Sequence, residues 1–519
     1  MPVTDRLRVG RSLGRSVGRS MGRIAWRAMA GLLIGLVLLV LAWLLFNLHD
    51  AEPQPRPAEL ALPPPRLADD RNAFFALAGL RAAADQEPAA AGRAEWLSRL
   101  EWAAQDRALN AAQRQQRTLE LVRERASKPT AALLPSLSGP PYVCNGASED
   151  CTAQWMAQAP ALAAQRQRHA ELGQRCDRLV AGALEFEERL PPLLSVHEPL
   201  AGHALGAVIC SGWLRSGALL AWVDGRPEQA TVGLQQADRL SRALLAGSQS
   251  LIGRMVAVRI QHDTLATITA LALRDRAMAQ ALQPLLAQGP DQLQAIRRWM
   301  RVEAAFQQGA VAELDRELTG PSATPMAVEG GVWQQALVWA SNGLARRHIG
   351  WHPQRTLADL DAHWLHAVNS LAAGVPAALA QAQAEALAAQ DKTALLQASW
   401  RNPVGQVLQW VAAPAYLGYL EREADLNLHQ QAAALAIAAQ LAGVPATERK
   451  GWAAQQSLAP NVRERIVWSG DGQLMTVNLW ISVAAPHATA PRRDQIRLAW
   501  PGHSTSAVSP ASPPTAQLR

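Results

Sequence analysis

The sequence predicts a mainly α-helical protein with an N-terminal transmembrane helix, an α-solenoid-like array of antiparallel helical hairpins and a small C-terminal β-hairpin. Three observations lead to this prediction. An uncharged apolar run covers residues 28–46. Apolar residues at helical spacing, interrupted by glycine and proline, then continue to about residue 456. Beyond residue 461 the spacing changes to the alternation that is typical of strands.

These changes divide the 519 residues into six segments. They are an arginine-rich tail (1–27), the membrane helix (28–46), a proline-rich linker (47–68), a helical domain (69–460), a small β element (461–500) and a tail for which we expect disorder (501–519). The six prolines of the linker predict extended backbone and a spacer above the bilayer.

Positive charge is concentrated at the N-terminus. Residues 1–27 contain seven arginines and one acidic residue, Asp5, so they carry +6 of the formal net charge of +7. The remainder of the chain is therefore almost neutral, and we expect no nucleic-acid partner. Arginine and alanine are greatly favoured over lysine along the whole chain, which is typical of a GC-rich bacterial genome.

The apolar run has the length of a membrane-spanning helix. Its 19 residues contain no charge and no proline, and at about 1.5 Å per residue they nearly cross a hydrocarbon layer of about 30 Å. The arginines precede the run, while Asp50 and Glu52 follow it. The positive-inside rule then places the N-terminus in the cytoplasm and the bulk of the chain in the periplasm. The alternative, a cleaved signal peptide, would need a shorter apolar run and a small-x-small cleavage site.

Four residues of this region have specific expected roles. Trp26 and Trp43 lie near the two ends of the run, where tryptophan anchors a helix at the lipid interfaces of the inner membrane. Gly31 and Gly35 form a GxxxG pattern, which allows two membrane helices to approach closely. The sequence thus leaves open a dimer of membrane helices.

The four cysteines all follow the membrane segment, where disulfides are the expected state of an even number of cysteines. Cys151 and Cys176 fall at opposite ends of one predicted helical stretch, so they should not pair. Cys176 and Cys210 are equally far from a helical turn expected near residue 193. We therefore predict the pairs Cys144–Cys151 and Cys176–Cys210. A zinc site is the alternative, but none of the gaps is the short C-x2-4-C that zinc favours.

Punctuation by glycine and proline sets the expected helices. One short helix begins at Asp69 or Asp70 and runs to Ala82, one long helix covers 93–126, and Pro160 kinks or splits a helix that begins at Ser148. Further helices are expected at 198–224, 227–246, 249–273, 276–288, 290–317, 331–346, 355–373, 376–398, 403–424 and 426–442. Tryptophans on their apolar faces are interpreted as packing residues, with a ligand groove as the alternative; these are Trp299, Trp333, Trp339, Trp364, Trp400 and Trp410.

One turn carries a recognisable pattern. Gly225 ends a predicted helix and Pro227 begins the next, with Trp222, Ala230 and Ala237 at helical spacing around them. This stretch of about thirty residues resembles a tetratricopeptide-type repeat unit, which implies helical hairpins stacked side by side. No second copy follows at a spacing of 34 residues. The C-terminal hairpin is expected at 462–468 and 474–481, with a third strand at 496–500.

A search for catalytic and metal-binding motifs finds no strict match, so no cofactor and no catalytic residue is assigned, and an enzyme is not the favoured interpretation. Asp359, His363 and His366 share one helix face and could bind a divalent ion. They lie opposite a face of Leu357, Leu360, Trp364, Val368 and Leu371, so we interpret them as a solvated face without metal.

Three glutamates, Glu185, Glu187 and Glu188, are the other acidic cluster. An acid–base pair would need them in a cleft, and Arg189 can pair with Glu185 at a spacing of four residues. We interpret the cluster as surface charge.

The resulting hypothesis is a membrane-anchored periplasmic helical protein that binds or organises an envelope protein partner. Two alternatives remain. One is an enzyme that acts on an envelope polymer such as peptidoglycan, using acidic residues in the helical array. The other is a structural subunit of a secretion or pilus machine. The sequence identifies neither the partner nor the oligomeric state.

The topology is directly testable. A reporter that is active only outside the cytoplasm, fused after Arg519, should be active, because the arginines hold residues 1–27 on the cytoplasmic side. A stable but inactive fusion would contradict the predicted orientation.

Overall fold

Helices dominate the computed structural model, which describes residues 29–106, 155–191, 202–287, 292–319, 350–388, 402–480 and 495–500 and the single positions 26, 109, 113, 116, 117, 119 and 120. The chain separates into two units, each described here by itself. The first unit comprises Met1–Pro55, Val311–Asp359 and Ala389–Val411, and the second comprises Arg56–Ala310, Leu360–Ala388 and Ala412–Arg519.

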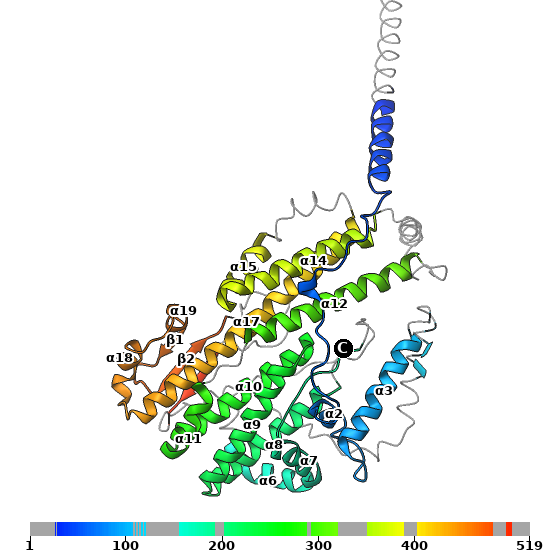
Figure 1. The fold of residues 1–519 in the computed structure, drawn as a ribbon. Coiled ribbons are helices and arrows are strands. Elements are labelled where there is room, and N and C mark those ends of the chain that lie inside the picture. Colours follow the sequence, from blue (N-terminus) through cyan, green and yellow to red (C-terminus); the bar gives the residue numbers. More distant parts are fainter. Residues whose placement is uncertain are drawn as a thin grey trace, which may run out of the picture. The chain divides into compact units, whose positions relative to one another are not determined.

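The elements follow one another with short connections (Figure 1). The helices are α2 (Ala73–Ala78), α3 (Pro88–Asp106), α6 (Ala159–Arg168), α7 (Ala170–Ala181), α8 (Ala204–Val223), α9 (Pro227–Gly247), α10 (Leu251–Ala272), α11 (Arg276–Ala287), α12 (Gln292–Thr319), α14 (Pro353–Ser370), α15 (Val375–Ala388), α17 (Pro403–Leu441), α18 (Arg449–Ala454) and α19 (Pro460–Arg463). Short 3-10 turns occur at η1 (Ala58–Leu60), η3 (Leu371–Ala373) and η4 (Ala446–Glu448). The strands are β1 (Ile466–Trp468), β2 (Leu474–Asn478) and β3 (Gln495–Ala499).

The predicted helical hairpin is confirmed by α8 and α9. Gly225 lies between them with φ +73°, a conformation that favours glycine, and Pro227 occupies the first turn of α9. α8, α9 and α10 pack against one another (Figure 1). The expected helices 403–424 and 426–442 are instead one helix of 39 residues, α17. No glycine or proline interrupts residues 419–441, and Leu426 is buried in the core, so nothing ends the helix at the predicted point. A repeating solenoid arrangement stays a prediction.

The N-terminal helix Met29–Phe46 is long and apolar enough to span a membrane. Its aliphatic side chains are exposed, and no other part of the protein lies within 4 Å of a side chain added at Gly31 or Gly35. Trp26 is exposed and Trp43 is partly buried. A second helix of similar composition, α8, is mostly buried and serves as a core helix.

The end of the membrane helix is joined to the first unit by buried polar contacts, which we call the juxtamembrane network. The backbone N–H of Asn402 donates to the Asn47 side chain (3.1 Å), and the backbone N–H of His352 donates to the Asn402 side chain (3.0 Å). The Nε2 atom of His352 lies 3.1 Å from the backbone oxygen of Asn47. All three residues are fully buried. Asp50 follows and accepts two backbone N–H groups at the N-terminus of α14.

The proline-rich segment is extended, as its composition predicts, but in the second unit it lies against helices. Leu60 is fully buried in a cluster with Ile296 and Trp299 of α12. The Arg56 guanidinium donates to the backbone oxygen of Arg301 (3.3 Å). Residues 56–68 therefore contribute to the core of this unit rather than standing free of it.

One disulfide joins Cys176 of α7 to Cys210 of α8, with the two Cα atoms 5.1 Å apart. This confirms the predicted pair, while Cys144 and Cys151 lie outside the described residues. The helix before the turn is shorter than expected, however, because α7 ends at Ala181 and residues 183–191 are extended. Closing a loop of 34 residues contributes at most about 4 kcal/mol in the chain-entropy view.

The extended segment corrects the interpretation of the glutamates as surface charge. Glu187 and Glu188 are buried, and only Glu185 pairs at the surface, with Arg71 (2.6 Å). Arg189 contacts Glu187 (3.1 Å) and Asp69, not Glu185 as predicted. The spacing of four residues that would bring Arg189 to Glu185 exists only in a helix, and this segment is not helical.

The two buried glutamates satisfy backbone N–H groups. Glu187 accepts those of Arg66 (2.8 Å) and Leu67 (2.9 Å). Burial alone would raise the pKa of Glu187, but these backbone bonds and the neighbouring arginines outweigh it, and the net pKa is lowered. Glu188 accepts the backbone N–H and the hydroxyl of Ser250, the residue that caps α10. A carboxylate at this helix N-terminus is favoured by the helix dipole.

A fully buried ion pair joins α10 to α17. The Arg254 guanidinium donates to both carboxylate oxygens of Glu423, one of them at 2.8 Å, and to the backbone oxygen of Leu245 at the end of α9. Neither side chain has any exposed surface. One guanidinium therefore fixes the relative position of three helices.

The small sheet confirms the predicted alternation. β1, β2 and β3 are antiparallel in that order, with Met475 opposite Leu498 and Val477 opposite Ile496. These four side chains are buried against the C-terminal part of α17. Gly472, with φ +66°, ends the turn between β1 and β2, where a Cβ would lie 1.9 Å from the backbone oxygen of Ala446.

His203 is buried between two aromatic rings beside the N-terminus of α8. Its ring centroid lies 5.1 Å from that of Phe74 and 5.3 Å from that of Phe186. Its Nδ1 atom has no hydrogen-bond partner. Burial lowers the pKa of His203, and the charge of Glu188 opposes this only in part.

We predict that Arg254→Met lowers the free energy of unfolding by about 3–5 kcal/mol, because Glu423 is left buried without its partner. The double variant Arg254→Met/Glu423→Leu should recover much of that loss. Urea denaturation measures both, with Arg226→Met in the exposed pair with Asp224 as the control, expected below about 1 kcal/mol. Equal effects at the buried and exposed pairs would contradict the prediction.

We also predict that stability falls as pH drops below the ordinary His value of 6.5. The unfolded chain takes up a proton there, whereas folded His203, with its lowered pKa, does not, so protons favour the unfolded state. His203→Phe should reduce the loss of Tm between pH 7.5 and 5.5. His366→Gln, at an exposed site, is the control. An unchanged pH dependence in His203→Phe would refute the assignment.

Candidate functional site

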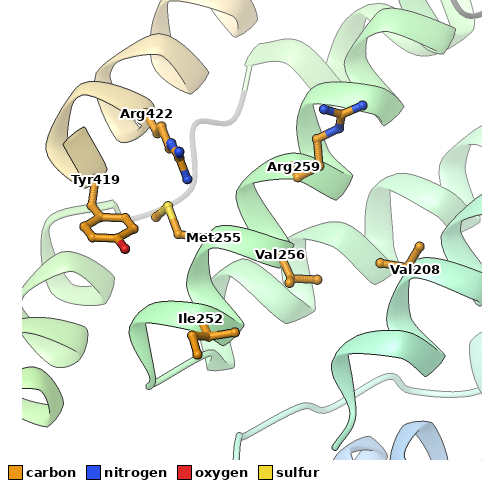
Figure 2. Close-up of a pocket in the computed structure, with 7 residues that line it drawn as sticks. All are labelled: Val208, Ile252, Met255, Val256, Arg259, Tyr419 and Arg422. Atoms are coloured by element: carbon orange, nitrogen blue, oxygen red, sulfur yellow. The ribbon is translucent and has the colours of Figure 1, made fainter. Parts of the chain in front are cut away.

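An open groove in the second unit is the best candidate for a functional site. It is lined by α8, α10 and α17 and has a volume of about 300 Å³ (Figure 2). The seven described residues that line it are Val208, Ile252, Met255, Val256, Arg259, Tyr419 and Arg422. Four of them are aliphatic or methionine and none is acidic.

Helix α10 supplies one continuous stripe of the groove. Ile252, Met255, Val256 and Arg259 are spaced i, i+3, i+4 and i+7, so they share one helix face. The helix begins at a fixed point because Ser250 accepts the backbone N–H of Gly253 and is itself held by Glu188. The opposite faces of α10 are buried against its neighbours. The stripe is therefore held on a rigid element.

The neighbouring helices supply the walls. Val208 belongs to α8, and Leu205 lies one turn before it and is also exposed. Tyr419 belongs to α17, where its ring packs edge-on against the buried Trp299, with centroids 6.5 Å apart. The Arg254–Glu423 pair joins the same two helices, α10 and α17. Figure 2 shows the aliphatic side chains between the helix of Tyr419 and that of Val208.

Two arginines give the groove a positive rim. Arg422 lies over the Tyr419 ring, 5.6 Å from its centroid. Arg259 contacts Asp263 at 3.1 Å, but that carboxylate also serves the buried Arg215 at 3.7 Å. One carboxylate thus faces two guanidinium groups, and among the described residues Arg422 has no carboxylate within ion-pair distance. The rim carries net positive charge.

The sequence-predicted metal candidates lie elsewhere. Asp359 is 3.4 Å from Gln406, while His366 lies 3.0 Å from Glu385. His363 is not on a solvated face as predicted: it is half-buried, with its ring edge-on to Tyr416 at a centroid distance of 5.3 Å. Burial lowers the pKa of His363. Within the described ranges no three such side chains are placed to hold a metal.

Glu385 is the centre of a polar cluster around His366. It accepts from Tyr416 (3.2 Å), and burial together with this carboxylate raises the pKa of the phenol. Gln381 also contacts Glu385 at 3.1 Å. Its side chains satisfy one another across α14, α15 and α17. No described cavity adjoins these residues, so the cluster is interpreted as a polar contact between helices.

The tryptophans follow the packing interpretation where they are described. Trp299 and Trp364 are buried, which confirms their role in the core. Trp333, Trp339, Trp400 and the side chain of Trp410 lie outside the described part of the chain. The groove residues were missed because α10 is apolar on nearly every face. Sequence periodicity alone does not distinguish the face that neighbours leave open.

Comparison with protein-family models, with curated proteins and with solved structures finds no match to this chain.

Proposed function

We propose that this chain is a membrane-anchored binding protein of the bacterial envelope, which captures a protein partner through the groove of α8, α10 and α17. The observation that carries the proposal is an apolar stripe that stays exposed on a rigid helix. Ile252 is 52% exposed and Val208 is 43% exposed. Exposed aliphatic side chains that gather in one groove are typical of protein contact sites.

The chemistry of the groove favours binding over turnover. General acid–base catalysis needs a titratable group within reach of the substrate, and the seven lining residues include only two arginines and a tyrosine that could ionise. The buried Glu187 and Glu188 are committed to backbone N–H groups and face neither this groove nor another described cavity. These observations support a scaffold over an enzyme acting on an envelope polymer.

The membrane segment supports the proposed location. A helix long and apolar enough to span a bilayer precedes the folded units, and the arginine-rich residues 1–27 favour a cytoplasmic N-terminus. In this proposal the inner membrane holds the protein by Trp26, Trp43 and the apolar helix, and the groove is presented to the periplasm. A dimer through Gly31 and Gly35 is compatible with the open face of that helix.

Site-specific photo-crosslinking in intact bacteria tests the proposal. A photoreactive residue at Ile252 should give a discrete adduct with an envelope protein, because a bound partner covers the groove. Val232 of α9 is equally exposed, at 52%, and is the matched control that should give none. The purified partner should then bind the full-length protein, and Ile252→Asp should weaken binding by about tenfold or more.

Two results would overturn the proposal. The first is a complete absence of adducts at Ile252 while the protein is folded and in the membrane. The second is cleavage of peptidoglycan by the purified protein that is lost on changing one acidic residue.

A further inference from the structure

The dimensions of the groove match a helix better than a small molecule. The stripe from Ile252 to Arg259 covers two turns of α10, about 10 Å along its axis. A third helix laid on this stripe, between the walls of Val208 and Tyr419, would place its own apolar residues at i, i+3, i+4 and i+7 against it.

The exposure of the lining residues points the same way. A small-molecule site encloses most of its ligand, roughly 70–90% of the ligand surface. Here Val208 and Ile252 keep about half of their surface open to solvent, so a lipid tail or metabolite would stay largely in water. An amphipathic helix buries only one face and leaves its polar face in solvent, which this groove permits.

The charge of the rim determines which helix fits. Arg422 has no acidic partner among the described residues, and Arg259 shares Asp263 with Arg215. Acidic residues that flank the apolar stripe of an incoming helix would meet these guanidinium groups. Lysine or arginine at the same positions would be repelled.

We propose that the groove binds an acidic amphipathic helix of the envelope partner, with aliphatic residues on Ile252, Met255 and Val256 and carboxylates beside Arg259 and Arg422. This inference rests on the proposed function and specifies the chemistry of the partner. The carboxylate beside Arg422 contributes most of the charge selectivity, because Arg259 is already neutralised in part by Asp263.

Three synthetic 18-residue peptides test the inference against full-length protein in nanodiscs of phosphatidylcholine. Two share leucines at i, i+3, i+4 and i+7 and differ only in carrying glutamate or lysine on the flanks. The third has the glutamates with the leucines scrambled. Fluorescence anisotropy should give binding of the acidic amphipathic peptide at least about tenfold tighter than either of the others, weakening as salt rises.

Charge reversal is the decisive variant. Arg422→Glu should reverse the preference between the glutamate and lysine peptides, since Arg422 is exposed and its replacement leaves the core unchanged. Ile252→Asp should weaken both. Val232→Asp is the control at an equally exposed site and should change neither.

The outcomes separate this inference from the proposed function. Equal binding of the three peptides, or an unchanged preference in Arg422→Glu, refutes the acidic helix; so does dodecanoate that binds the groove more tightly than the acidic peptide. If the peptides fail while crosslinking at Ile252 still captures an envelope protein, the proposed function stands and only the partner chemistry is wrong. If both fail, the groove is not the binding site.

Discussion

The guanidinium of Arg254 is shut off from water, and that constraint determines how the helices around it meet. An unpaired charge at this depth would be very costly, so α9, α10 and α17 must place one backbone oxygen and one carboxylate around it. Apolar packing alone tolerates small shifts of one helix along another, but a bidentate ion pair does not. The groove follows from this constraint, because its stripe and one of its walls belong to the two helices that the pair joins.

Polar groups play the same part where the chain is not helical. Residues 183–191 have no helical hydrogen bonds of their own, yet Glu187 and Glu188 bind the backbone of the proline-rich segment and the start of α10. These contacts connect stretches more than sixty residues apart and replace an interior that the many alanines leave thin. The disulfide between α7 and α8 strengthens the same region.

Sequence reasoning succeeded where the signal is local. Gly225 and Pro227 mark a helical turn by their own conformational preferences, and the alternation through Met475 and Val477 identifies a half-buried strand. It failed where burial depends on distant residues. Glu188 looks like surface charge until Ser250 is brought to it, and the exposed face of α10 is defined only by where α8 and α17 stop covering it. That information resides in the packing and not in any short stretch of residues.

The juxtamembrane network gives the membrane helix a mechanical role. Between Phe46, the last residue of the helix, and Asp50, the chain has no slack, because Asn47 is fixed to His352 and Asn402 and Asp50 is fixed to the start of α14. A flexible tether would absorb a rotation of the helix about its own axis. This connection instead acts as a shaft coupling, so that a twist or tilt imposed within the bilayer is passed to the first turn of α14 as torque.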